Sequence, residues 1–141
     1  MILFDTDHAS VAYDGRGDRA ARLRGRLDRA GDELVGAPIT VVEEQMRGWM
    51  ASIAKERQAV RQVAAYRELA GLFEFYGKLY VAPIDEAAAE RFDQLRATHR
   101  RLGAMDLKIA AVALTRPAVL LSANLRDFSQ IPGLRVEKWL D

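Results

Sequence analysis

The chain has 141 residues, a formal net charge of +1 and no cysteine. Half of its residues are hydrophobic, which is enough for a real core, and we expect one domain over residues 1–141. The lack of cysteine excludes disulfides, thiolate metal ligands and a cysteine nucleophile. No apolar run can span a bilayer and no signal-peptide pattern opens the chain, so we expect a cytoplasmic protein without membrane contact.

The chain begins with an apolar run, Met1–Phe4, that is followed at once by Asp5 and Asp7. Such a run predicts a short buried strand. An acid at the end of a strand lies where open α/β sheets collect ligands. Both acids are equally suited to cap the helical turn expected over residues 8–13, so two roles remain open for each.

A basic helix and a second strand are expected next. Residues 14–17 are a turn signal, and Asp18 is expected to cap a helix that ends at Gly31. Four arginines share one face of this helix, which indicates either a solvated face or contact with RNA or an acidic partner. They are Arg19, Arg22, Arg26 and Arg29. Residues 34–39 predict a strand interrupted by Pro38, and Thr40 is expected to cap the following helix.

The helix after Thr40 carries Glu43 and Glu44 near its first turn, where the helix dipole favours a carboxylate. Its predicted buried face consists of Val42, Met46, Trp49, Met50 and Ile53. Residues 55–79 predict a long helical region, with a break at Gly71 or Gly77. Its apolar positions are Val60, Val63, Ala64, Leu69, Leu72, Phe73 and Tyr76. These positions are typical of a core face, although a groove for a partner is the alternative.

The second half of the chain continues the alternation of strands and helices. A strand is expected over residues 80–84, and Asp85 is expected to cap a helix that runs to about Leu102. Asp106 begins an alanine-rich helix that Pro117 stops. Residues 118–122 predict a buried strand, and residues 134–139 the last one. This order predicts a three-layer α/β/α sandwich around a mostly parallel sheet of four to five strands.

Four acids follow strands or open helices in this scheme. They are Asp5, Glu44, Asp106 and Asp127. Strand ends and the helix starts that follow them share one edge of a parallel sheet, so we expect Asp5, Glu44 and the loop of Asn124 and Asp127 to meet there. Asp106 joins them if its helix starts at that edge. Clustered carboxylates repel and raise one another's pKa. A hard divalent cation with a preference for oxygen ligands, Mg²⁺ or Mn²⁺, resolves this repulsion.

Four segments resemble the successive signature segments of PIN-domain ribonucleases, and in particular the VapC-type toxins of toxin–antitoxin pairs. They read M-I-L-F-D-T-D-H, I-T-V-V-E-E-Q-M-R-G, M-D-L-K-I-A-A-V-A-L and L-L-S-A-N-L-R-D-F-S-Q-I-P-G-L-R-V-E-K-W. The resemblance spans residues 1–139. It implies a PIN fold with catalytic, metal-binding acids at Asp5, Glu44 and Asp106. Asp127 is the implied fourth acid, with Asn124 as its alternative, and Glu43 remains an alternative to Glu44.

The resemblance also implies a function. It indicates a Mg²⁺- or Mn²⁺-dependent endoribonuclease toxin that cleaves structured RNA, transfer or ribosomal, by metal-activated water. A homodimer and a cognate antitoxin that blocks the acidic cleft are implied as well. Ser122, Asn124 and Arg126 are candidates to orient ligands or contact phosphate. Arg47, one turn beyond Glu44, is a candidate to face the same edge and contact substrate, although a structural salt bridge is its expected role. We expect Asp7 to cap a turn or hold a water beside the site.

Two other interpretations remain. A degenerate PIN fold can act as a partner-binding module alone, but acids stand at every family position that can be placed. A strand followed by Asp-x-Asp also begins haloacid-dehalogenase-like phosphatases, in which Asp5 would be the nucleophile and Asp7 the general acid. Those enzymes need a supporting lysine, and Lys108 lies inside a predicted helix, a poor position for that role.

Overall fold

The computed structural model describes residues 1–141 and contains a single five-stranded sheet. The strands are β1 (Ile2–Phe4), β2 (Val35–Pro38), β3 (Tyr80–Ala82), β4 (Val119–Leu121) and β5 (Arg135–Glu137). Their order across the sheet is β3-β2-β1-β4-β5, and every neighbouring pair is parallel. The predicted parallel sheet is confirmed. Because β1 is central, the residue that follows it, Asp5, lies in the middle of the sheet edge.

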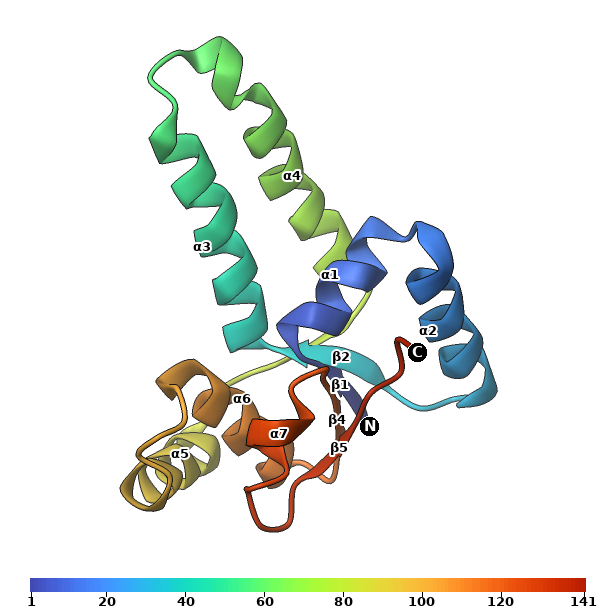
Figure 1. The fold of residues 1–141 in the computed structure, drawn as a ribbon, viewed down its shortest axis with the longest axis vertical. Helices are drawn as coiled ribbons and strands as arrows, with labels where there is room; N and C mark the ends of the chain where they lie inside the picture. The colour runs from blue at the N-terminus through green and yellow to red at the C-terminus, as the bar shows by residue number, and fades with distance from the viewer.

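Seven helices accompany the strands. They are α1 (Thr6–Asp14), α2 (Gly17–Arg29), α3 (Ile39–Lys55), α4 (Ala59–Gly77), α5 (Glu86–Thr98), α6 (Ala104–Thr115) and α7 (Leu125–Phe128). Helices α1 and α2 lie on one side of the sheet and α5 and α6 on the other, which gives the predicted three layers (Figure 1). Helices α3 and α4 form a hairpin that projects away from the sheet. None of the helices combines the length and apolar character that crossing a membrane requires.

The core is built around β1, β4 and α6. All residues of β1 and β4 are buried, as expected for short strands covered on both faces. In α6 the buried residues extend beyond the single face that its periodicity predicted, and between Leu107 and Ala113 only Lys108 is not buried. The buried residues are Leu107, Ile109, Ala110, Ala111, Val112 and Ala113. The small alanine side chains let this helix lie close to its neighbours on several sides, and its first turn carries Asp106.

Several helix boundaries differ from those expected. Helix α2 begins at Gly17, so Asp18 lies in its first turn and does not cap it. Helix α3 begins directly after Pro38, so Thr40 lies inside the helix, buried and without a partner for its hydroxyl. Asp85 does cap α5, as predicted, by accepting the N–H of Ala88 at 2.9 Å. That helix ends at Thr98, earlier than expected.

The α3–α4 hairpin was predicted least well. The break between its helices falls at residues 56–58 and not at a glycine. Gly71 lies inside α4, where an added Cβ would be 2.4 Å from the Tyr13 hydroxyl, so a larger residue would push this hydroxyl away from Glu68. Several apolar side chains of the hairpin are exposed, including some expected to be buried. We call them the hairpin apolar surface: Met50, Val60, Val63, Tyr66 and Phe73.

Candidate active site

Asp5 is the only buried acid of the chain, with 6% of its surface exposed. The sheet fixes its backbone, because its N–H donates to the carbonyl of Leu121 at 2.9 Å. Its carboxylate accepts the N–H of Thr6 at 2.7 Å, which caps α1, and the hydroxyl of Ser122 at 2.6 Å. Burial raises the pKa of Asp5 to about 6, although the hydrogen bond from Ser122 opposes the shift.

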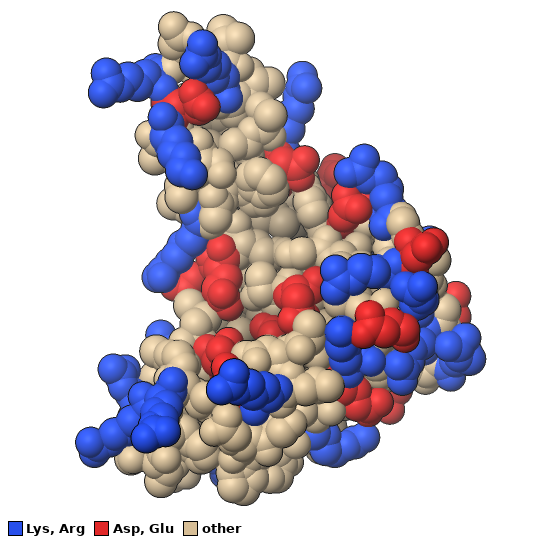
Figure 2. Space-filling model, viewed as in Figure 1, with Lys and Arg blue, Asp and Glu red and all other residues tan.

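Glu44 and Asp106 reach the same region from α3 and α6. Glu44 accepts the hydroxyl of Thr6 at 3.1 Å. Burial raises its pKa, and the nearby charge of Asp106 adds to the shift. The pKa of Asp106 is raised by burial and then by the charges of Asp127 and Asp7. These mutual effects indicate that the acids surround a common space, and Figure 2 shows acidic side chains gathered at the foot of the hairpin.

The neighbouring residues Glu43 and Glu44 have different surroundings. Glu43 forms an i,i+4 salt bridge with Arg47, whose Nη2 lies 2.5 Å from its carboxylate. Arg47 is largely exposed and therefore takes the structural role that was expected of it. Glu44 instead contacts Thr6, the residue directly after Asp5. The geometry therefore favours Glu44 over Glu43 as the site acid.

The loop after β4 supplies the remaining candidates. Ser122 is fully buried and accepts the N–H of Asn124 at 2.9 Å while it donates to Asp5. The side chain of Asn124 caps α7 and donates to Oδ2 of Asp127 at 3.1 Å. Asp127 is the member of this pair whose charge acts on Asp106. Arg126 is exposed on α7 and has no hydrogen bond or ion pair with these acids.

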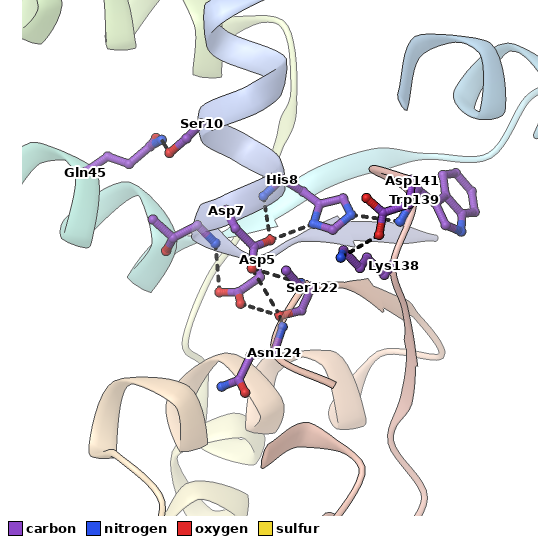
Figure 3. Close-up of polar contacts among 12 residues, drawn as sticks. Asp5, Asp7, His8, Ser10, Gln45, Ser122, Asn124, Lys138, Trp139 and Asp141 are labelled. Atoms are coloured by element: carbon purple, nitrogen blue, oxygen red, sulfur yellow. Dashed lines mark hydrogen bonds and ion pairs between the residues drawn. The ribbon is translucent and has the colours of Figure 1, made fainter. Parts of the chain in front are cut away.

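Asp5 is the N-cap residue of α1, and Asp7 lies in the first turn of this helix, where its Oδ1 accepts the backbone N–H of His8 at 2.6 Å. Its Oδ2 accepts the N–H of Ala123 at 2.9 Å, and its Oδ1 lies 2.6 Å from the ring nitrogen Nδ1 of His8 (Figure 3). Burial alone would raise the pKa of Asp7, but these hydrogen bonds hold it below its ordinary value. Asp7 is thus an ionised brace between α1 and the loop after β4.

Comparison with known families identifies the fold. The model of the PIN domain matches residues 2–134. This chain belongs to the PIN-domain family. It is 38% identical over 85 residues to a tRNA(fMet)-specific endonuclease VapC of Salmonella typhimurium, a match that covers 57% of this chain and 64% of that protein. It is 35% identical over 77 residues to the protein of the same name from Shigella flexneri, covering 52% and 58%. The matches thus span less than two thirds of either relative.

Solved structures agree with this placement. The PIN fold of this chain resembles the DNA-bound VapBC of Salmonella typhimurium with a TM-score of 0.75 at 28% identity, over 99% of both chains. It also resembles VapBC2 of Rickettsia felis, bound to a fragment of promoter DNA, with a TM-score of 0.77 over 99% of both chains. That second likeness, at 21% identity, concerns the fold alone. The predicted PIN fold and the VapC-type resemblance are confirmed.

The edge of the sheet near which Asp5, Glu44 and Asp106 lie, which we call the acidic edge, has the chemistry of a site for a hard cation. Its donors are carboxylate and hydroxyl oxygens, which Mg²⁺ and Mn²⁺ prefer. The pKa of Asp5, Glu44 and Asp106 is raised by burial and by charge, and a cation among them offsets both effects. No three acids or histidines converge on one point at metal-binding spacing in this arrangement. The donor set fits such a cation in type, and the ligation itself stays a prediction.

Two contributors to the site were not singled out from the sequence. Thr6 links Asp5 and Glu44, and His8 links Asp7 to Trp139 near the end of the chain. The D-T-D-H motif placed both residues beside the first acid. Nothing in it indicated their partners, which lie 38 and 131 positions further along the chain.

Proposed function

We propose that this PIN-domain protein is a Mg²⁺- or Mn²⁺-dependent endoribonuclease, the toxin of a toxin–antitoxin pair. The observation that carries the proposal is that Asp5, Glu44 and Asp106, from three separate elements, lie near enough for the charge of Asp106 to raise the pKa of the other two. The names of the Salmonella and Shigella relatives support transfer RNA as the substrate class. Ribosomal RNA is the second candidate. A cytoplasmic location follows from these substrates.

Each residue of the edge has a definable part in hydrolysis. Asp5, Glu44 and Asp106 would hold a divalent cation through carboxylate oxygens, while Ser122 and Thr6 orient two of these carboxylates. Such a cation would supply Lewis-acid chemistry for the attack of water on the phosphodiester. Asp127 would accept the proton of the attacking water at Oδ1, the oxygen that the Asn124 amide leaves free. Catalysis needs no side-chain nucleophile.

We further propose an antitoxin as the regulatory partner and a homodimer as the assembly. Solved neighbours of the fold are VapBC complexes, which supports a partner of this kind. The hairpin has an apolar groove of about 230 Å³ next to its apolar surface. The groove is lined by Val42, Met46, Leu72, Phe73, Tyr76 and Gly77. An antitoxin segment that places its apolar side chains there can bring a cationic side chain to the acidic edge and compete with the metal.

The phosphatase alternative is disfavoured by Asp7 and Lys108. A general acid must carry a proton, whereas the lowered pKa of Asp7 keeps this carboxylate ionised. The ammonium of Lys108 lies over the ring of Phe92, 5.6 Å from its centroid, and forms no ion pair with Asp5. The binding-only alternative is disfavoured because carboxylates stand at all the proposed site positions.

The decisive experiment is RNA cleavage by purified, antitoxin-free protein. Wild type is compared with Asp106→Asn and with Asp28→Asn, a matched change at an exposed acid of α2. Each is assayed on transfer RNA with Mn²⁺, with Mg²⁺ and with EDTA. We expect metal-dependent cleavage by wild type and Asp28→Asn and none by Asp106→Asn. Equal cleavage by all three would move the site elsewhere, and an inert wild type that still binds its antitoxin would establish the binding-only alternative.

A further inference from the structure

His8 is a fully buried histidine that joins two distant parts of the chain. Its Nε2 accepts the backbone N–H of Trp139 at 3.0 Å, and its Nδ1 lies 2.6 Å from Oδ1 of Asp7 (Figure 3). A backbone N–H can only donate, so Nε2 carries a lone pair and the ring proton is on Nδ1. The geometry therefore selects one tautomer of His8, in which Nδ1–H donates to Asp7.

The line of contacts continues from His8 to Asp5. Asp7 accepts the N–H of Ala123 at 2.9 Å, and the hydroxyl of Ser122 lies 3.4 Å from the same carboxylate oxygen. That hydroxyl donates to Asp5 at 2.6 Å. The orientation of the Asp5 carboxylate thus depends on a loop that Asp7 holds, and Asp7 is in turn held by His8.

Helix α2 fixes the other end of this line. The guanidinium of Arg26 lies over the ring of Trp139, 4.7 Å from its centroid, and donates to the carbonyl of Lys138 at 3.3 Å. Arg22 donates to the carbonyl of Leu140 at 3.5 Å. Trp139 and Leu140 are buried beneath these contacts. Arg22 and Arg26 belong to the basic stripe, the four arginines that share one face of α2. They therefore hold the C-terminal segment, which we define as residues 138–141, and do not simply face solvent.

We propose that His8 is a positioning residue for the acidic edge, and that it couples the C-terminal segment to Asp7 and, through the Ser122 loop, to Asp5. The inference deepens the proposed function and rests on it where it concerns metal and RNA. Loss of the contact with Asp7 leaves this carboxylate held only by the backbone N–H groups of His8 and Ala123, and loss of the contact with Trp139 leaves the ring itself less well fixed. Substitution of a group that supports a metal ligand in this way typically lowers metal affinity or activity by about 10- to 100-fold.

Two substitutions separate the two contacts of the ring. In His8→Asn the amide reaches the position of Nδ1, so it can donate to Asp7 but cannot reach Trp139. In His8→Gln the side chain reaches the position of Nε2, so it can accept from Trp139 but leaves Asp7 without its side-chain donor, with only backbone N–H donors remaining. We expect the Mn²⁺ dissociation constant to rise about tenfold or more in His8→Gln and less in His8→Asn. His99→Gln, at the other histidine of the chain, is the matched control and should leave it unchanged.

Nitrogen NMR of the metal-free protein gives a readout that does not depend on activity. With only two histidines, the His99→Gln spectrum assigns His8. We expect the Nδ1–H tautomer in wild type and in Trp139→Ala, which keeps the backbone N–H, and a shifted Nε2 resonance in Trp139→Pro, which removes the hydrogen bond to that nitrogen. Thermal unfolding of every variant separates loss of fold from loss of position.

The outcomes distinguish this inference from the proposed function. An Nε2–H tautomer in wild type would overturn the inference. It would also fail if the His8 variants lose thermal stability while they bind Mn²⁺ and cleave RNA as wild type does. If instead wild type has the Nδ1–H tautomer and the His8 variants bind Mn²⁺ more weakly as expected, but wild type cleaves no RNA, the positioning role stands and the proposed function fails.

Discussion

The acidic edge and the α3–α4 hairpin are opposite kinds of surface, although α3 contributes to both. At the edge, polar groups are buried and satisfy one another, as Asp5, His8 and Ser122 do. On the hairpin, apolar side chains face solvent, with Val60 84% and Phe73 67% exposed. The polar groups of the edge find their hydrogen-bond partners within the chain, whereas the apolar side chains of the hairpin have no such cover, and an exposed apolar patch of this kind marks a contact site for another molecule. We infer that the edge performs the chemistry and that the hairpin serves its restraint by a partner.

Asp5→Asn breaks the edge and has the largest expected effect. RNA cleavage should fall by more than about a hundredfold, beyond what the loss of a merely supporting group costs. The metal-free protein should not lose stability, because burial raises the pKa of Asp5 and so penalises the ionised carboxylate. Cleavage rates and urea unfolding of both proteins test the two halves of this prediction. A clear loss of stability would contradict a crowded acidic site.

The pH dependence of this difference has a defined sign. The pKa of Asp5 in the folded protein, about 6, lies above its ordinary value of 3.8, so folding favours the protonated form. Its protonation contributes stability that is complete below pH 3.8 and is lost as the pH rises through 6. Metal-free wild type should therefore lose up to about 3 kcal/mol from this group between pH 4 and 7, which Asp5→Asn does not lose. Urea midpoints of both proteins at four pH values measure the difference, and a constant difference would rule out the buried ionisable group.

Glu44→Gln tests which glutamate belongs to the edge. We expect it to reduce cleavage by about a hundredfold, since it removes a ligand charge. Glu43→Gln should leave cleavage nearly unchanged, because Glu43 is paired with Arg47. Steady-state kinetics in Mn²⁺ compare the two variants. The opposite ranking would assign Glu43 to the site.

Two neighbouring residues of α4 test the character of the hairpin. Leu72 is 2% exposed, so Leu72→Ala should cost about 2–5 kcal/mol of unfolding free energy. Phe73→Ala should change stability by less than about 0.5 kcal/mol. It should nevertheless weaken antitoxin binding by about 2 kcal/mol or more, roughly 30-fold, as loss of an aromatic anchor does. Urea unfolding and titration with antitoxin measure these effects. Equal losses of stability would place Phe73 in the core.

The smallest expected effect concerns Arg26. Arg26→Gln removes the guanidinium from the Trp139 ring and should weaken Mn²⁺ binding by about two- to fivefold, the equivalent of the 0.5–1 kcal/mol of an exposed cation–π contact. Arg29→Gln, on the same helix and exposed, is the control and should have no effect. Calorimetric titration with Mn²⁺ resolves the pair. The same loss in both variants would return the basic stripe to a general electrostatic role.

The edge was more predictable than the hairpin for physical reasons. Continuous apolar runs such as residues 1–4 and 118–122 have few solutions other than buried strands. Parallel topology then places Asp5 and Glu44 at the same edge, because strand ends share it. Asp106 opens α6, which follows another helix, so its place depended on where that helix starts. The pairs Thr6–Glu44 and His8–Trp139 could not be predicted, since no local pattern encodes a contact between residues so distant in the chain.

Periodicity failed on the hairpin because it shows which residues share a helix face but not whether that face is covered. Val60, Val63 and Phe73 were therefore expected in the core and are exposed. Thr40 illustrates a second limit. A hydroxyl residue before an apolar run indicates an N-cap, but α3 starts directly after Pro38 and encloses Thr40.

The identity of the attacking group tests the central claim most directly. If the acidic edge activates water, cleavage of RNA in ¹⁸O-labelled water with Mn²⁺ should leave a linear terminal phosphate that contains one labelled oxygen. Cleavage should also persist when the ribose at the cleaved position lacks its 2′-hydroxyl. A 2′,3′-cyclic phosphate without label, together with loss of cleavage on the 2′-deoxy substrate, would show that the RNA's own hydroxyl attacks and would contradict the account.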